Sequence, residues 1–357
     1  MKNSLLITSK RFCLLLILMM LGFGSFSQTN WTLLTPKPLG FTIYDASFVD
    51  ANNGWAVGEA GTIAKTTDGG ITWTNRAMPP YTGNGLVNFR PQQLTAVQFL
   101  NLNVGYATGF NGAVLKTTDG GINWNYINGP FGPMSSTSKI IYNLYFFDVN
   151  NGWIVGDVIN ASSANIYKTT DGGTTWTAAT NFPVLGNNLW GIDFVNPSIG
   201  YISGANGKVI KTTDGGTTWT DISLTTTNYT VVGGIATIPK QQTYPCVQVL
   251  DANTVVISSA NNGCVLRTTN GGTTWYASGN QGYGLPQMAT WQMVATGPNK
   301  DTIIMSGGQA RIAKSVDRGL TWTTQQHYTT STNVYNTYYA PVVVPGVAGK
   351  YIMLGAS

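Results

Sequence analysis

Short hydrophobic runs alternate with turns rich in Gly, Asn, Asp and Thr along most of the chain. A run around Phe48 is followed by a polar turn and a second run around Trp55, and the same pair recurs around Phe99 and Tyr106. Four such runs make one unit of roughly 40–50 residues, and helical periodicity is absent after residue 27. Four short strands per unit at this period predict an all-β fold built from propeller blades.

Each unit carries the same nonamer between its third and fourth runs. Residues 65–73 read Lys-Thr-Thr-Asp-Gly-Gly-Ile-Thr-Trp, and five further copies follow. Their Asp or Asn positions lie 51, 52, 43, 56 and 47 residues apart. The six positions are Asp68, Asp119, Asp171, Asp214, Asn270 and Asp317, and the closing tryptophans are Trp73, Trp124, Trp176, Trp219, Trp275 and Trp322. The repeat predicts six blades.

These nonamers resemble the Asp-box, also called the bacterial neuraminidase (BNR) repeat. The full unit resembles the propeller domain of photosystem II assembly and stability factors, within the sialidase-like superfamily. The resemblance covers nearly the whole chain after residue 27 and implies a seven-bladed propeller of four-stranded antiparallel blades. In those families the box hairpin is structural and lies away from the ligand face. Asn270 favours that role here, because an amide keeps a hydrogen-bond acceptor but cannot serve as an acid or base.

The two ends of the chain predict a seventh blade. Residues 30–33 are typical of a fourth strand that lacks its first three, and residues 341–344 and 351–356 are typical of a first and a second strand. Joining the ends would close the ring with the N-terminal strand and remove its exposed sheet edges. A third strand and a seventh nonamer are missing. Either this blade is reduced or the sequence is a fragment; we favour the fragment, in which case a C-terminal sorting domain is also missing.

The first 27 residues have the pattern of a secretory signal peptide. Lys2, Lys10 and Arg11 precede an apolar run over residues 12–21, and small residues follow at 25 and 27. We expect cleavage after Ser27, a secreted or cell-surface protein without a membrane span, and a single propeller domain over residues 28–357. Removing three basic residues leaves 16 basic and 14 acidic residues, a net charge of +2. Such a weak charge argues against nucleic-acid binding, and we expect a monomer.

Cysteine and histidine limit the chemistry of the chain after residue 27. Cys246 and Cys264 remain, and export permits a disulfide, but their spacing leaves the bridged and the free state open. His327 is the only histidine, and no Cys-x-x-Cys pair is present. We therefore expect no metal site and no cofactor.

The loops before the first strands and after the second strands carry the candidate ligand-binding residues. Propellers usually bind ligands on the face that these loops form. The candidates are Tyr44, Glu59, Arg90, Asp157, Trp190, Asp193, Trp291 and Arg311. Trp190 and Trp291 could stack on a sugar or grip a peptide, but we slightly favour a role in capping the core near the channel mouth. Asp193 precedes a first-strand Phe, where other units carry Ser47, Gln98 or Tyr145, and for it we favour a structural role, hydrogen bonding to neighbouring backbone at the channel wall.

A binding or scaffolding module for a protein or a glycan fits these features better than an enzyme. A sialidase needs an arginine cluster and a tyrosine–glutamate pair, yet Glu59 is the only glutamate and most arginines lie in or beside the nonamers. A xyloglucanase-like glycoside hydrolase, the alternative, needs two carboxyls roughly 6.5–9.5 Å apart. Asp193 is the best single candidate for one of them, and the sequence assigns it no catalytic partner.

Overall fold

The computed structural model describes residues 40–83, 86–91, 93–131, 139–157, 165–180, 186–225, 227–232, 243–260, 264–278, 290–307, 311–326 and 338–355. These residues belong to one compact unit that spans positions 37–357. The predicted signal peptide and the predicted N-terminal strand at residues 30–33 lie outside the described residues, as does His327. No helix among the described residues is long and apolar enough to cross a membrane.

Six blades each contain four antiparallel strands that follow the order of the chain; five of these sheets have four strands, and the sheet of blade 5 has a fifth strand at its outer edge. Blades 1 to 3 are β1 (Ile43–Phe48), β2 (Gly54–Gly58), β3 (Ile63–Thr66) and β4 (Thr74–Arg76); β7 (Leu94–Phe99), β8 (Gly105–Gly109), β9 (Val114–Thr117) and β10 (Asn125–Tyr126); and β11 (Ile141–Phe146), β12 (Gly152–Gly156), β13 (Ile166–Thr169) and β14 (Thr177–Ala178). Blades 4 to 6 are β15 (Leu189–Phe194), β16 (Gly200–Gly204), β17 (Val209–Thr212) and β18 (Thr220–Asp221); β20 (Cys246–Val249), β21 (Val255–Ser258), β22 (Val265–Thr268) and β23 (Trp275–Ser278); and β24 (Thr290–Thr296), β25 (Thr302–Gly307), β26 (Arg311–Ser315) and β27 (Thr323–Gln326).

Two further strands form the described part of the seventh unit. β28 (Tyr338–Val343) pairs antiparallel with β29 (Tyr351–Gly355), close to the first and second strands predicted at this end of the chain. The predicted class, an all-β propeller of four-stranded antiparallel blades, is confirmed. It has six complete blades, and the described part of the seventh is this two-stranded sheet, which we call blade 7.

Additional elements lie in the connections between strands. β5 (Tyr81–Gly83) and β6 (Leu86–Phe89) form a separate hairpin between blades 1 and 2. β19 (Tyr229–Val232) pairs in parallel with β23 at the outer edge of blade 5. The single turn η1 (Ala205–Gly207) joins β16 to β17.

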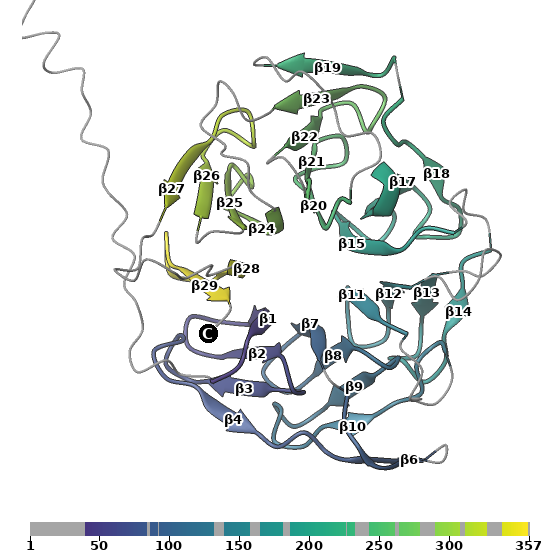
Figure 1. Ribbon diagram of the computed structural model, residues 1–357, viewed down its shortest axis with the longest axis vertical. Coiled ribbons are helices and arrows are strands. Elements are labelled where there is room, and N and C mark those ends of the chain that lie inside the picture. The colour runs from purple at the N-terminus through teal and green to yellow at the C-terminus, as the bar shows by residue number, and fades with distance from the viewer. Residues whose placement is uncertain are drawn as a thin grey trace, which may run out of the picture. The chain divides into compact units, whose positions relative to one another are not determined.

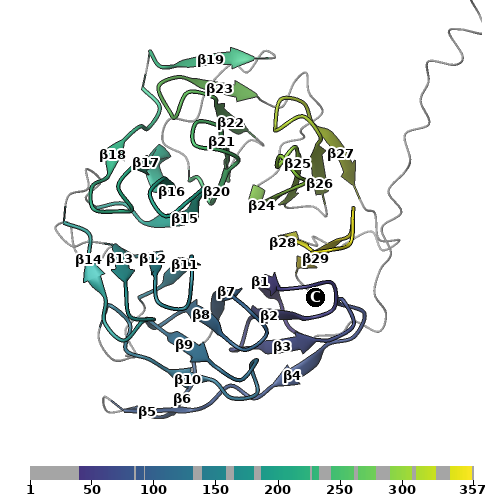
Figure 2. The ribbon, with the colours of Figure 1, turned by 180° about the vertical axis from the view of Figure 1, so that it is seen from behind.

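The first strands line the axis of the unit, as Figures 1 and 2 show. Each contacts the next in the order β1, β7, β11, β15, β20, β24 and β28, and β28 contacts β1 again. The ring therefore closes through blade 7, which sits between blades 6 and 1. Closure of this kind leaves only the short edges of the first strands at the axis.

Aromatic pairs hold neighbouring blades together. The second strands are buried along their whole length in blades 1 to 4, because sheets cover both of their faces. Trp55 of β2 stacks on Phe99 of the next blade with ring centroids 3.6 Å apart, and Tyr106 of β8 stacks on Phe146 in the same way at 3.9 Å. Burial of such large rings is the main apolar contribution at these interfaces.

The nonamer forms the hairpin between the third and fourth strands. In blade 1 the Asp68 carboxylate accepts hydrogen bonds from the Thr72 N–H at 2.9 Å and from the Thr72 and Thr66 hydroxyls. The Thr66 hydroxyl also accepts from the Gly70 N–H. In blade 5, Asn270 accepts the equivalent N–H bond through its side-chain oxygen. The Asp or Asn side chain thus satisfies donors inside its own turn.

Candidate functional site

The face where the first strands begin and the second strands end carries most of the predicted ligand-binding residues; we call it the loop face. Six of the seven first strands have a register shift directly after their first paired residue. The residues skipped by the pairing are Tyr44, Thr95, Tyr142, Trp190, Trp291 and Tyr339. Five of these six are aromatic. A β-bulge locally changes the direction of the strand, and at these bulges aromatic residues recur around the ring.

Glycine at the end of the second strand makes the bulge possible. In all six bulged pairs the residue opposite the first paired residue is glycine, whereas β21 ends in Ser258 and its partner β20 has no register shift. A Cβ on Gly58 would lie 2.0 Å from the Thr42 carbonyl oxygen, and one on Gly156 would lie 2.4 Å from the Ile140 carbonyl oxygen. Only a residue without a Cβ permits so close an approach.

Tyr142 of blade 3 and Trp190 of blade 4 form a stacked pair on the loop face. Their ring centroids are 5.0 Å apart and their planes differ by 24°. Both side chains are half-buried. Burial and a hydrogen bond with Asp157 raise the pKa of Tyr142, which also bonds Asn188. Asp157 in turn accepts the Ile140 N–H at 2.9 Å. The pair therefore has a fixed position with carboxylate and amide groups beside it.

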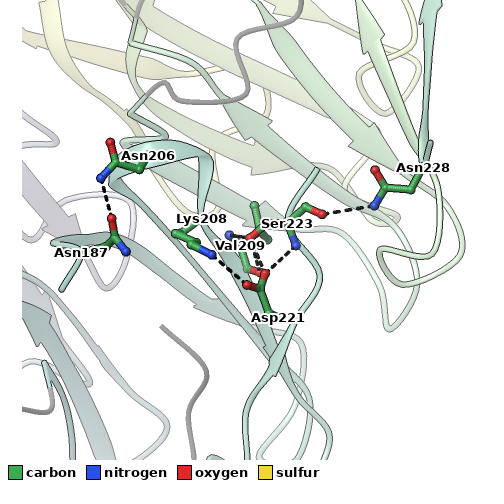
Figure 3. Close-up of polar contacts among 7 residues, drawn as sticks. All are labelled: Asn187, Asn206, Lys208, Val209, Asp221, Ser223 and Asn228. Atoms are coloured by element: carbon green, nitrogen blue, oxygen red, sulfur yellow. Dashed lines mark hydrogen bonds and ion pairs between the residues drawn. The ribbon is translucent and has the colours of Figure 1, made fainter. Parts of the chain in front are cut away.

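Further asparagine side chains lie on the loop face of blade 4, beyond the carboxylate and amide groups beside the aromatic pair. Asn206 donates to the side-chain oxygen of Asn187 at 2.5 Å (Figure 3). The Asn188 carbonyl accepts the Ala205 N–H. Asn206 adopts a left-handed backbone with φ of 55°, which asparagine tolerates better than most residues.

An ion pair lies on the same face of blade 4, between the residue before β17 and the end of β18. Figure 3 also shows Lys208 bonded to Asp221 at 2.9 Å, beside Ser223 and Asn228. The loop face of blade 4 thus presents amides and, at the outer strands β17 and β18, one ion pair.

The other candidates on this face are dispersed. Glu59 and Arg90 are exposed, and Tyr44 is half-buried at the start of β1. Trp291 and Arg311 lie at the starts of β24 and β26, and their side chains lie outside the described residues. Of the predicted ligand residues, the structure brings together Asp157 and Trp190, through Tyr142.

Asp193 does not lie with these residues, which corrects its placement on the ligand face. It is the fifth of six residues in β15, near the end of the strand far from the loop face. Its carboxylate accepts hydrogen bonds from the Val249 N–H at 2.6 Å, the Gln248 side chain at 2.8 Å and its own neighbour's N–H. Burial raises its pKa to about 6, although Lys300 and these hydrogen bonds oppose the shift.

The same strand position joins blades elsewhere in the ring. Ser47 accepts the Phe99 N–H, and the Gln98 side chain bonds both backbone groups of Phe146. Tyr145 donates to the Phe194 carbonyl, and Gln248 accepts the Ala295 N–H. In blades 1 to 5 the position therefore carries a hydrogen bond to the next blade, although the residue type differs. A polar residue at this place in these five units was the sequence signal for this role.

Asp45 makes a similar bond two residues earlier in its strand. Its carboxylate accepts the Val97 N–H at 2.8 Å, and burial raises its pKa to about 7 despite two backbone hydrogen bonds. Asp45 and Asp193, the two carboxyls with a raised pKa, thus each accept a hydrogen bond from a backbone N–H of a neighbouring blade. Among the described residues no group of three His, Cys, Asp or Glu side chains is arranged to hold a metal ion.

The two cysteines are free thiols, so the alternative of a disulfide is not realised. Cys246 pairs with Ser258 of β21, and Ser258 pairs with Val265 of β22 on its other side. A whole strand therefore separates Cys246 from the strand that follows Cys264. Two strand spacings of about 4.8 Å exceed the distance that a disulfide can span. Burial raises the pKa of both thiols to about 12.

Comparisons with known proteins agree with this architecture. The family described as Photosynthesis system II assembly factor YCF48 matches residues 25–181 and 133–290, together about three quarters of the chain. The structure titled YCF48 bound to D1 peptide superposes with a TM-score of 0.62 and 21% identity, covering 89% of this chain and 92% of that one. YCF48 from Cyanidioschyzon merolae gives a TM-score of 0.63 and 17% identity over 90% and 94%.

More distant propellers share the fold. An ancestral GH74 enzyme gives a TM-score of 0.59 and 14% identity over 90% of this chain and 44% of its own. At this level of identity the likeness shows the fold alone. A comparison with curated proteins gives no significant match. Because the family match extends over most of the chain and agrees with the blades described above, the protein belongs to the Photosynthesis system II assembly factor YCF48 family.

Proposed function

We propose that this protein is an exported, non-catalytic propeller that binds a segment of another protein on its loop face, at the junction of blades 3 and 4. The observation that carries the proposal is the stacked pair of Tyr142 and Trp190, with Asp157 and Asn188 at its edge. Family membership supports it, because a relative of the same fold has been solved with a peptide bound.

The chemistry of this junction suits an extended peptide. Two aromatic rings held by neighbouring strands offer a large contact area at a low entropy cost, since each has only two side-chain torsions. The Asp157 carboxylate and the asparagine amides can bond to backbone groups of a ligand and fix its direction. The junction is more polar than charged, so we expect shape and hydrogen bonding to select the partner.

The central carboxyls favour binding over hydrolysis. A glycoside hydrolase needs a protonated acid and an ionised base that both face the scissile bond. Asp193 and Asp45 instead accept hydrogen bonds from the backbone of adjacent blades. Their raised pKa values follow from burial, which here needs no catalytic explanation.

Peptide selection on the purified protein tests the proposal. Peptides selected from a displayed random library would be titrated against the wild type, Trp190→Ala and Tyr142→Ala. Tyr276→Ala, which removes an exposed tyrosine of β23, is the matched control. We expect at least roughly tenfold weaker binding for the two loop-face variants and no change for the control. Equal binding by all variants would refute the site.

Two further measurements separate the alternatives. Release of sugar from xyloglucan that Asp193→Asn abolishes would make the protein a hydrolase. Competition between a soluble glycan and the selected peptides would make it a glycan-binding module. Export is tested by the N-terminal residue of the secreted protein, which we expect to be Gln28.

A further inference from the structure

The Asp157 carboxylate lies at the edge of the Tyr142–Trp190 pair. The Asp157 side chain is half-buried, accepts the Ile140 N–H at 2.9 Å and hydrogen-bonds with Tyr142. These two contacts hold the carboxylate beside the rings. An ionised carboxylate has about four lone-pair positions, so it can accept further hydrogen bonds from a ligand.

Few charged residues surround this junction of blades 3 and 4. Four connections border it on the loop face: residues 127–140, 157–165, 179–188 and 205–208. Lys139, Asp157 and Lys208 are their charged residues. Asp157 is therefore the only carboxylate in these connections, and the two lysines decide whether its charge is already compensated.

Both lysines have partners elsewhere. Lys208 pairs with Asp221 at 2.9 Å, at the outer strands of blade 4. The Lys139 ammonium lies over the Phe131 ring, 5.3 Å from its centroid, and Phe131 packs against the apolar cluster between blades 2 and 3. Within the described part of the chain neither of the two ion pairs involves Asp157. Its charge is thus available to a ligand.

A ligand that stacks on the two rings also covers the carboxylate beside them. Covering an ionised carboxylate is costly unless the ligand supplies a cation or hydrogen-bond donors in place of the water. An acidic side chain would repel Asp157, and an aliphatic one would leave its charge without a partner. The charge reaches the rings, since the pKa of Tyr142 is raised by burial and then by the hydrogen bond and the negative charge of Asp157.

Arginine meets both requirements of the site, the aromatic surface and the carboxylate. Its guanidinium is planar, so one face can lie against an aromatic ring while the edge donates two N–H groups to a carboxylate. A lysine ammonium is a compact, strongly hydrated charge without this flat shape. Backbone amides and sugar hydroxyls can bond the carboxylate, but they do not compensate its charge.

We propose that the segment bound at this junction presents an arginine whose guanidinium pairs with Asp157 and lies against the Tyr142–Trp190 pair. The inference rests on the proposed function, because it names one residue of the segment that the loop face binds. Shape and the asparagine amides act along the whole segment, and Asp157 selects this one residue.

The test starts from a selected peptide whose binding is weakened by Trp190→Ala. We expect such peptides to share an arginine. A synthetic twin carries citrulline in its place, which keeps the shape of arginine but has no charge. Fluorescence anisotropy should show that the wild type binds the arginine peptide at least roughly tenfold more tightly than the twin, and that added salt reduces this preference.

Asp157→Asn removes the charge and keeps an oxygen that can accept the Ile140 N–H, so we expect this variant to fold. It should lose the preference for arginine over citrulline and bind the citrulline twin as the wild type does. Asp214→Asn is the matched control, because it removes a carboxylate from the nonamer hairpin of blade 4, at the strand ends far from the loop face. Asn270 holds the same turn in blade 5, so this control should fold and keep the preference.

Failure of this inference and failure of the proposed function give different results. The arginine inference would be overturned, and the site would stand, if peptides that depend on Trp190 share no arginine or if the two twins bind equally. An unchanged preference in Asp157→Asn, or loss of the preference in Asp214→Asn as well, would also overturn it. Peptides that bind Trp190→Ala and Tyr142→Ala as tightly as the wild type would refute the proposed function, and this inference with it.

Discussion

Stability should fall as the pH rises from mildly acidic to neutral, because Asp45 and Asp193 are buried between blades. Burial raises the pKa of Asp45 to about 7 and that of Asp193 to about 6, whereas an unfolded chain has a value of about 3.9. A raised folded-state pKa means that the folded protein holds these protons more tightly than the unfolded chain. The contribution to stability is therefore complete below about pH 4 and is lost as the pH rises through about 6 and 7.

The magnitude follows from linkage. One pKa unit corresponds to about 1.4 kcal/mol, so Asp45 contributes ~4 kcal/mol and Asp193 ~3 kcal/mol over the full range. Between about pH 4.5 and 5.5 the folded protein binds up to two more protons than the unfolded chain, which gives a slope of up to about −2.7 kcal/mol per pH unit. The box carboxylates have lowered pKa values, so their contribution to stability is lost as the pH falls from about 5 and offsets part of the slope at the acidic end of this window. The slope that belongs to Asp45 and Asp193 is therefore measured between about pH 5 and 7.

Urea unfolding followed by tryptophan fluorescence at several pH values measures this slope. Asp45→Asn and Asp193→Asn should each remove the part of the slope that belongs to the replaced carboxyl. Asp221→Asn is the control, because hydrogen bonds from Ser223 and Lys208 lower the pKa of Asp221 despite its burial. A free energy of unfolding that is constant or rises between about pH 5 and 7, or an unchanged slope in both variants, would refute the reasoning.

Three further predictions concern single residues. Gly156→Ala places a Cβ 2.4 Å from the Ile140 carbonyl oxygen, so we expect the free energy of unfolding in urea to fall by ~2–4 kcal/mol. Gly40→Ala, with open space around it, is the control and should change this free energy little. Equal stability of the two variants would contradict the role of the bulge. Asp171→Ala should destabilise by ~1–2 kcal/mol and Asp171→Asn by less than ~1 kcal/mol, because Asn270 holds the same turn in blade 5; the reverse order of the two in thermal melts would argue against the hairpin role. A reducing agent should leave the melting temperature unchanged, since both thiols are free; a clear drop would reveal a disulfide.

The repeat pattern was sufficient to predict the blades. Each unit's hydrophobic runs, its glycines and its nonamer determine contacts within about 50 residues of chain. Contacts of this range can be predicted without knowing how the adjacent blades pack. The predicted run around Trp55 is β2, and the run predicted at 351–356 is β29. The candidate aromatic positions were also identifiable, because they recur at the starts of the first strands.

For Asp193 the sequence indicated the role but not the position. Hydrogen bonding to neighbouring backbone was the favoured explanation of this carboxylate, and the Val249 and Phe194 N–H groups donate to it. The residues at the same position, Ser47, Gln98 and Tyr145, also bond the first strand of the next blade. The sequence could not show that this position lies away from the loop face, because the location depends on how the strands pack in the ring.

What the sequence determined by itself is the fold of each blade, because strand, turn and hairpin depend on residues close together in the chain. What the tertiary structure decided is how the blades meet: the pairing of Tyr142 with Trp190, the hydrogen bond from Val249 to Asp193, and the closure of the ring through blade 7. Both pairs join residues of neighbouring blades that are about 50 positions apart in the chain. Their geometry therefore depends on the packing of whole sheets, which no local pattern of residues records.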